Sequence, residues 1–189
     1  LLAAVVLIGC NDDRPETPLA PAKDYIAKGD NKAAVIQLKN VLQSAPNQGE
    51  ARFLLGRSLL ASGDASAAEV ELKKARELNY PSDQVTPVLA RAQLMLGQGK
   101  KVIDDFALVE LSSADSRADL QNTLGQAYLI TGKIDQAKAA FDASLAAVPD
   151  YGPALIGQAR IRAGQGDLPG GLALLDGVLA KTPKSFEAW

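Results

Sequence analysis

Glycine-rich stretches are the parts of this sequence whose residue types and spacing could do chemistry. Residues 97–101 read Gly-Gln-Gly-Lys-Lys, which suggests comparison with a phosphate-binding loop. That loop requires a glycine five residues before its Gly-Lys pair and a serine or threonine after it, because backbone N–H groups and a hydroxyl must reach the phosphates and Mg²⁺. Leu94 and Lys101 occupy these two places. The stretch is therefore interpreted as a turn between helices.

Two further patterns also fail as reactive sites. Residues 164–171 carry four glycines, but Pro169 takes the last glycine position of the dinucleotide-binding fingerprint, and no strand is expected before it. Asp104 and Asp105 are adjacent, so on a helix their side chains point about 100° apart and cannot flank one substrate. We interpret them as solvated residues.

Composition excludes several classes of function. The chain of 189 residues has no His and one Cys, so it cannot form a histidine-based triad, an internal disulfide or a zinc site with Cys or His ligands. A net charge of -2 gives no cationic excess for a phosphate backbone. We expect no enzyme activity, no cofactor, no metal ion and no nucleic-acid partner.

The single cysteine lies in a processing signal. Residues 1–9 are apolar apart from Gly9, Cys10 follows, and the sequence becomes polar from Asn11. Residues 7–10, Leu-Ile-Gly-Cys, resemble the bacterial lipobox, in which the cysteine is lipidated and becomes the first residue of the mature protein. We therefore predict that residues 1–9 end a signal peptide and that Cys10 carries the lipid. Residues 10–21 would form a flexible linker from the bilayer to the folded part.

The elements that position the remaining side chains are revealed by an internal repeat. Glycines end successive apolar helical runs at intervals of 34, 36, 33 and 34 residues, namely Gly29, Gly63, Gly99, Gly132 and Gly166. This period is typical of tetratricopeptide repeats (TPRs), each of which is a hairpin of two helices. Residues 22–185 are thus predicted to form about five TPR units, and residues 186–189 to begin a further one. The fold class is all-α, a right-handed superhelical solenoid with a concave groove lined by the first helices.

Individual units fit this frame unequally. The fourth matches best, with small and large apolar residues at the packing positions: Leu124, Gly125, Tyr128, Ala137, Phe141 and Ser144. The third, residues 85–118, carries Arg91 and Asp104 where a small core residue is usual. Gly97, two residues before Gly99, leaves the position of its turn open.

The groove is the candidate binding site. The frame places ten side chains of the first helices on its surface, and their mixture of amide, cationic and apolar groups suits an extended peptide. They are Lys23, Ile26, Phe53, Arg57, Leu60, Gln93, Asn122, Gln126, Ile156 and Arg160. Lys23, Arg57 and Arg160 are too widely spaced to form a carboxylate clamp.

Beyond the repeat pattern, three runs are distinctive. They are AKDYIAKGDNKAAVIQLKN at residues 22–40, EARFLLG at residues 50–56 and AEVEL at residues 68–72. Together with the lipobox, they resemble the TPR-repeat lipoproteins of the PEP-CTERM/exosortase system, the PrsT family. This resemblance implies a role in exopolysaccharide production and export, and a longer protein with more repeats.

Taken together, the sequence predicts a lipid-anchored TPR scaffold in the Gram-negative cell envelope. It would face the periplasm from the inner or the outer membrane and bind other envelope proteins. Two alternatives stay open. The groove could bind a glycan, although glycan sites usually present stacked aromatic rings that are sparse here, or the repeats could be an accessory domain of an enzyme that follows them.

Overall fold

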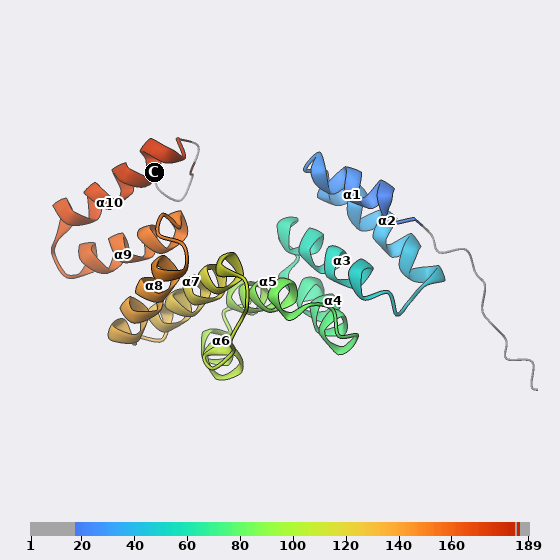
Figure 1. Ribbon diagram of the computed structural model, residues 1–189, viewed down its shortest axis with the longest axis horizontal. Helices are drawn as coiled ribbons and strands as arrows, with labels where there is room; N and C mark the ends of the chain where they lie inside the picture. Colours follow the sequence, from blue (N-terminus) through green and yellow to red (C-terminus); the bar gives the residue numbers. More distant parts are fainter. Residues whose placement is uncertain (1–17, 184, 186–189) are drawn as a thin grey trace, which may run out of the picture.

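The computed structural model describes residues 18–183 and 185. All the regular secondary structure in this part of the chain is α-helix, joined by short turns and loops (Figure 1). The predicted all-α array of helical hairpins is confirmed. Ten helices pair in sequence order: α1 Ala20–Ala27, α2 Asn31–Ser44, α3 Gly49–Ala61, α4 Ala65–Glu77, α5 Ser82–Met95, α6 Gly99–Phe106, α7 Ala114–Ile130, α8 Ile134–Ala147, α9 Gly152–Gly164 and α10 Leu168–Lys181. The predicted signal peptide, Cys10, most of the predicted linker and residues 186–189 lie outside the described residues.

Left-handed glycines end the first helix of each hairpin. Gly29, Gly63, Gly132 and Gly166 have φ between +75° and +90°, a conformation in which any side chain would be strained. In three hairpins the residue after the glycine is an aspartate that accepts a hydrogen bond from a backbone N–H of the second helix, at 2.9–3.0 Å. These caps satisfy helix-end donors that would otherwise lack partners.

In the third hairpin the turn lies at Gly97, whereas the sequence frame placed it at Gly99. Gly97 has φ +73°, and Gly99 is already the first residue of α6. The N–H of Gln98 donates to the carbonyl of Gln93 at 3.0 Å, which is the hydrogen bond that closes a helix ended by a left-handed residue. The frame of this unit therefore moves by two residues. The corrected intervals between turns are 34, 34, 35 and 34 residues.

This correction explains the unusual residues of the third unit. The small packing position of α5 falls on Ala90, and its partners on α6 are Val102 and Phe106, all of which are buried. Arg91 and Asp104 no longer occupy core positions, and both are exposed.

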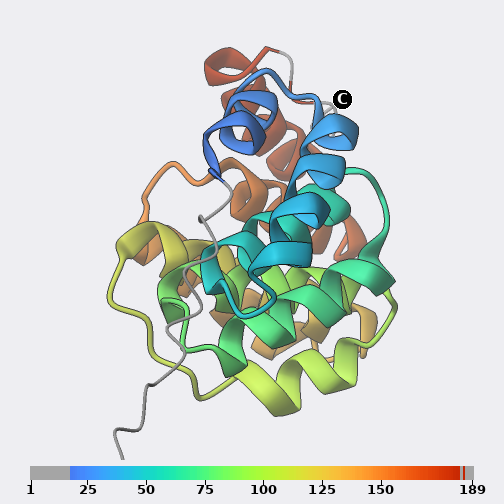
Figure 2. The ribbon, with the colours of Figure 1, turned by 90° about the vertical axis from the view of Figure 1, so that its right-hand side faces the viewer.

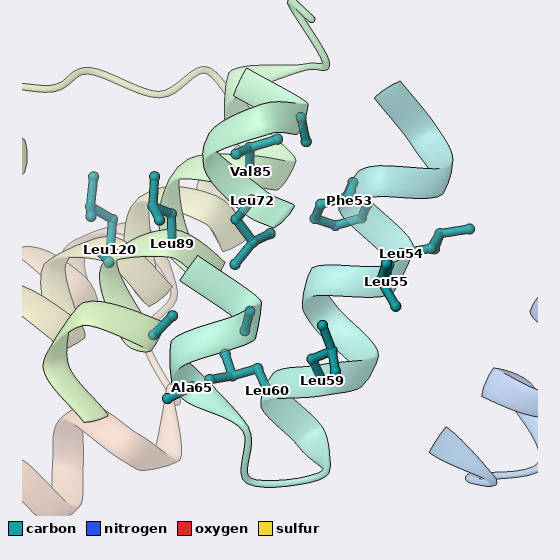
Figure 3. Close-up of a cluster of buried hydrophobic side chains, with 14 of the residues drawn as sticks. Phe53, Leu54, Leu55, Leu59, Leu60, Ala65, Leu72, Val85, Leu89 and Leu120 are labelled. Carbon is teal, nitrogen blue, oxygen red and sulfur yellow. The ribbon is translucent and has the colours of Figure 1, made fainter. Parts of the chain in front are cut away.

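Small residues let the two helices of a hairpin approach closely. A Cβ atom on Gly56 would lie 2.6 Å from Cγ of Leu72, and one on Gly125 would lie 2.5 Å from the ring of Phe141. Leu72 and Phe141 are fully buried and fill the space that these glycines leave. Figure 3 shows the central cluster around Leu72, to which α3, α4, α5 and α7 contribute.

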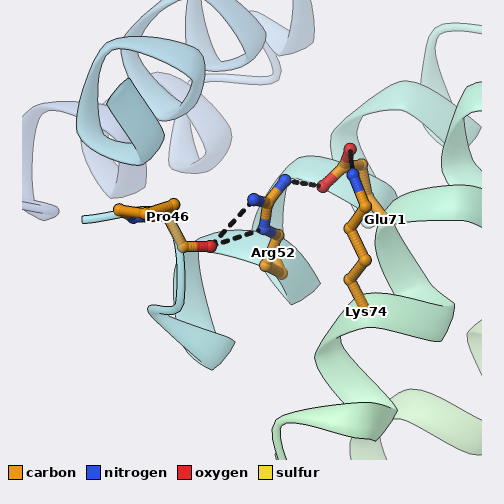
Figure 4. Close-up of polar contacts among 4 residues, drawn as sticks. All are labelled: Pro46, Arg52, Glu71 and Lys74. Carbon is orange, nitrogen blue, oxygen red and sulfur yellow. Dashed lines mark hydrogen bonds and ion pairs between the residues drawn. The ribbon is translucent and has the colours of Figure 1, made fainter. Parts of the chain in front are cut away.

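Polar contacts fix the junction between the first two hairpins (Figure 4). Arg52 on α3 donates two hydrogen bonds, at 3.0 and 2.8 Å, to the carbonyl of Pro46, the second residue after the end of α2. Its remaining nitrogen forms an ion pair of 2.6 Å with Glu71 on α4, and both side chains are about 85% buried. Lys74 adds an ion pair of 3.3 Å to the same carboxylate.

The stacked hairpins form an arc. In Figure 1, α3, α5 and α7 line the inner side of the arc, and α4 and α6 lie outside. Figure 2 looks from the N-terminal end and shows α9 and α10 behind α1 and α2, so both arms rise on the same side. Within the described range, no helix combines the length and apolar character needed to cross a membrane.

Candidate functional site

The inner side of the arc is hollowed near its C-terminal end. A cavity of about 480 Å³ opens between α7, α9 and α10. Its walls combine aliphatic side chains with amide, guanidinium and hydroxyl groups, including Gln126, Leu129, Pro153, Ile156, Arg160 and Thr182. Three residues predicted for the groove are thus brought together here: Gln126, Ile156 and Arg160.

A second hollow of about 150 Å³ continues the first toward the middle of the arc. The two share Gln126, Leu129 and Arg160, and the second adds Leu94 of α5 and Ile130 of α7. We call these joined hollows the inner groove. It spans three first helices, which is the geometry that an extended chain segment requires.

In the N-terminal half, the predicted residues are placed differently. Phe53 is 4% exposed and its ring stacks on Tyr80, with centroids 5.0 Å apart. The guanidinium carbon of Arg57 lies over the Phe53 ring, 5.6 Å from its centroid. Lys23 forms an ion pair of 2.8 Å with Glu50 on α3. Lys23 and Arg57 are exposed to solvent. The ring of Phe53 is buried and offers no free surface on which a sugar could stack.

Two other predicted apolar residues of this half also serve the core. Leu60 is 8% exposed and belongs to the main hydrophobic cluster, and Ile26 is half-buried against that cluster. Asn122 on α7 is buried as well, and its Oδ1 has no hydrogen-bond partner among the described residues.

Gln93 does not face the groove, contrary to the prediction. It is 1% exposed, and its amide nitrogen lies 3.3 Å from Glu69 on α4 and 3.5 Å from Asp105 on α6, which are both second helices. The cause is the two-residue shift of the third unit, which turns Gln93 toward the second helices α4 and α6. Lys101, by hydrogen bond and charge, holds the pKa of Asp105 below its ordinary value.

Arg91 takes the place that the shifted frame had given to Gln93. It forms an ion pair with Asp119 on α7, and it remains about half exposed. Tyr151 lies beside this pair: its burial, together with the charge of Asp119, raises its pKa to about 12. The sequence does contain a signal that identifies Arg91, namely its distance from the turn glycine. Arg91 stands six residues before Gly97, just as Arg57 stands six residues before Gly63.

Three residues that line the groove are not among those predicted from the sequence: Leu94, Leu129 and Pro153. Leu94 and Leu129 each stand three residues before a left-handed glycine, at the same place in the repeat as the predicted residues Ile26 and Leu60. Along residues 18–183, no cluster of carboxylates or thiols is suited to hold a metal ion. The groove can thus form hydrogen bonds, ion pairs and apolar contacts with a ligand.

Comparisons with known proteins agree with this architecture. Two family models described as tetratricopeptide repeat match residues 25–92 and residues 122–186, which together make up most of the chain. No curated protein sequence is significantly similar to the chain.

Solved structures share the fold over most of their length. The crystal structure of MamA is similar with a TM-score of 0.65 and 25% identity, covering 86% of this chain and 95% of that one. YrrB, described as a TPR protein with an unusual peptide-binding site, has a TM-score of 0.63 and 17% identity, covering 92% and 91%. PilW, described as a type IV pilus biogenesis factor, has a TM-score of 0.74 and 18% identity, covering 87% and 76%.

Proposed function

We propose that this chain, which belongs to the tetratricopeptide repeat family, holds an extended segment of another protein in its inner groove. TPR domains bind other proteins, and their scaffold is typical of domains that do not catalyse reactions. The observation that carries the proposal is the inner groove itself, two hollows that share walls and together border three first helices. YrrB is described as having a peptide-binding site on a similar array.

The groove walls suit a polypeptide chain. Gln126 and Thr182 can form hydrogen bonds with backbone amides, and Leu129 and Ile156 can contact apolar side chains. Each hydrogen bond with the ligand replaces one with water, so specificity depends on several such contacts along the segment.

We further propose where this binding takes place. The lipobox-like run before Cys10 supports lipid anchoring, and the resemblance to the PrsT family supports a periplasmic role in exopolysaccharide export or the PEP-CTERM/exosortase system. In this proposal the protein is a membrane-anchored scaffold that gathers envelope proteins. A partner held near the membrane needs less affinity per contact, because tethering raises its effective concentration.

Blocking the groove tests the binding role. The variant Gln126→Trp fills the hollow that Gln126 borders, and Ala139→Trp places the same side chain on the exposed surface of α8 as a control. The wild-type protein and both variants would be immobilised and incubated with envelope extracts, after circular dichroism has shown equal helicity.

We expect the wild type and Ala139→Trp to retain the same envelope proteins and Gln126→Trp to lose them. Equal retention by all three forms would show that proteins bind outside the groove. Retention of polysaccharide without protein would favour the glycan-binding alternative.

A further inference from the structure

We propose that the inner side of the arc selects an acidic segment of its partner, in which carboxylate side chains are interspersed with aliphatic ones. This inference rests on the proposed protein-binding function and specifies the chemistry of the bound segment. It depends on two rows of side chains that recur once per hairpin.

The first is a cation row. Six residues before the left-handed glycine of each hairpin stand Lys23, Arg57, Arg91, Gln126 and Arg160, four of which are cationic. Since the hairpins repeat, these side chains occupy equivalent places on successive first helices. Gln126 is the one member that carries no charge.

Contacts of the row place it on the inner side. Lys23 reaches Glu50 on α3, and Arg91 reaches Asp119 on α7, so each pairs with the first helix of the following hairpin. Arg160 borders the inner groove together with Leu129. In the described part of the chain, none of these cations is paired with a carboxylate on a second helix.

Two members of the row lack a carboxylate partner among the described residues. Arg57 lies on the ring of Phe53, with no ion pair, and Arg160 faces the cavity. A guanidinium held on an apolar surface is weakly hydrated and well suited to receive a carboxylate. These two cations are therefore the principal contacts that we assign to the partner.

The charge of the row differs from that of the whole molecule. The chain has a net charge of -2, yet the row carries four cations against the two carboxylates of Glu50 and Asp119 that pair with it. A concave surface with an excess of one sign of charge concentrates ligands of the opposite sign. Charge complementarity thus favours an acidic partner over a neutral or basic one.

The second is an aliphatic row. Three residues before the turn glycines stand Ile26, Leu60, Leu94, Leu129 and Ala163, of which Leu60 is buried in the core and the others lie beside the cation row. Leu94 and Leu129 line the inner groove, and Ile26 is partly exposed. Acidic side chains of the segment would meet the cation row while its aliphatic side chains contact this second row.

The spacing of the cation row suits several side-chain carboxylates along a bound segment. It does not suit the single carboxylate of a C-terminus. The cations are distributed over four hairpins, and of the four only Arg160 borders the cavity. A single terminal carboxylate could contact one of them at a time, whereas an internal segment can contact several.

Synthetic peptides test the inference directly. Three peptides of about twelve residues, long enough to reach about 40 Å when extended, would repeat Glu-Leu-Ser, Gln-Leu-Ser or Lys-Leu-Ser. Acetylated and amidated ends remove terminal charges. Their binding to the protein would be measured by fluorescence anisotropy with the wild type, with Arg57→Gln/Arg160→Gln, and with the control Lys39→Gln/Lys100→Gln, whose changes lie on the exposed surfaces of α2 and α6.

We expect the Glu peptide to bind at least tenfold more tightly than the Gln peptide and the Lys peptide to bind least. The arginine variant should lose about tenfold in affinity for the Glu peptide, since each partly exposed ion pair contributes a factor of up to about five. The lysine control should bind as the wild type does, and salt should weaken the Glu peptide selectively.

Equal affinity for the Glu and Gln peptides, or an unchanged affinity of the arginine variant, would overturn the acidic preference. If the wild type still retained envelope proteins that Gln126→Trp loses, the proposed function would survive that result. Failure of both experiments would remove the two proposals together.

Discussion

Phe141 lies between two glycines, and replacing either should destabilise the protein. The positions that a Cβ atom would take on Gly125 of α7 and on Gly157 of α9 lie 2.5 Å and 2.4 Å from atoms of the Phe141 ring. The ring is fully buried and contacts both helices, so it cannot move away from one without approaching the other. The change Gly125→Ala therefore forces the two helices apart.

Two opposing effects set the magnitude. Overpacking a well-packed core costs about 2–3 kcal/mol. Replacing glycine by alanine within a helix stabilises the folded state by about 1 kcal/mol, because alanine has the higher helix propensity. The net loss of unfolding free energy is about 1–2 kcal/mol, which lowers Tm by about 3–6 °C for a chain of this length.

Gly177→Ala supplies the matched control. Gly177 lies inside α10 with open space around its Cβ position, so the same exchange should raise the unfolding free energy by about 1 kcal/mol. Urea unfolding followed by circular dichroism at 222 nm would measure both variants. The packing argument would be refuted if Gly125→Ala stabilised the protein as much as Gly177→Ala does.

Three other predictions concern charge and anchoring. Arg52→Ala should cost about 2 kcal/mol in urea unfolding, because it leaves the mostly buried Glu71 without its main partner, whereas Lys74→Ala should stay within about 0.5 kcal/mol. The pKa of Tyr151 is raised to about 12, so its contribution to stability is complete below pH ~10 and is lost as the pH rises toward 12; Tyr151→Phe should reduce the fall of the urea midpoint over that range. Cys10→Ser should abolish labelling by a radioactive fatty acid in the native host and release the protein from membranes, and retained labelling would place the lipid elsewhere.

Much of the fold could be predicted because each turn has a local cause. A glycine that must adopt positive φ cannot be replaced cheaply, so Gly29, Gly63, Gly132 and Gly166 mark hairpin turns directly in the sequence. The third hairpin was misplaced because Gly97 and Gly99 are both glycines near a helix end. The positive φ of Gly97 and the hydrogen bond from the N–H of Gln98 to the carbonyl of Gln93 distinguish them.

The residues that line the groove were harder to predict, because a residue lines it only if neighbouring hairpins leave its side chain exposed. A frame position indicates a helix face but does not show how far a neighbouring hairpin covers it. Phe53 stands on the expected face of α3. Tyr80, which lies in the turn between α4 and α5, stacks on the Phe53 ring and helps to bury it. Leu129 was passed over, yet it lines the groove because α9 leaves it partly open. An error of two residues in one unit was enough to exchange Arg91 for Gln93.

The central claim is that the inner side of the arc, and not the outer, holds another protein. Site-specific photo-crosslinking in living cells tests it most directly, with a benzophenone amino acid at Gln126 or Arg57 on first helices and at Ala139 or Lys39 on second helices. We expect defined protein adducts to form from the two inner positions and not from the two outer ones. Adducts that form equally from all four positions, or only from the outer two, would contradict it.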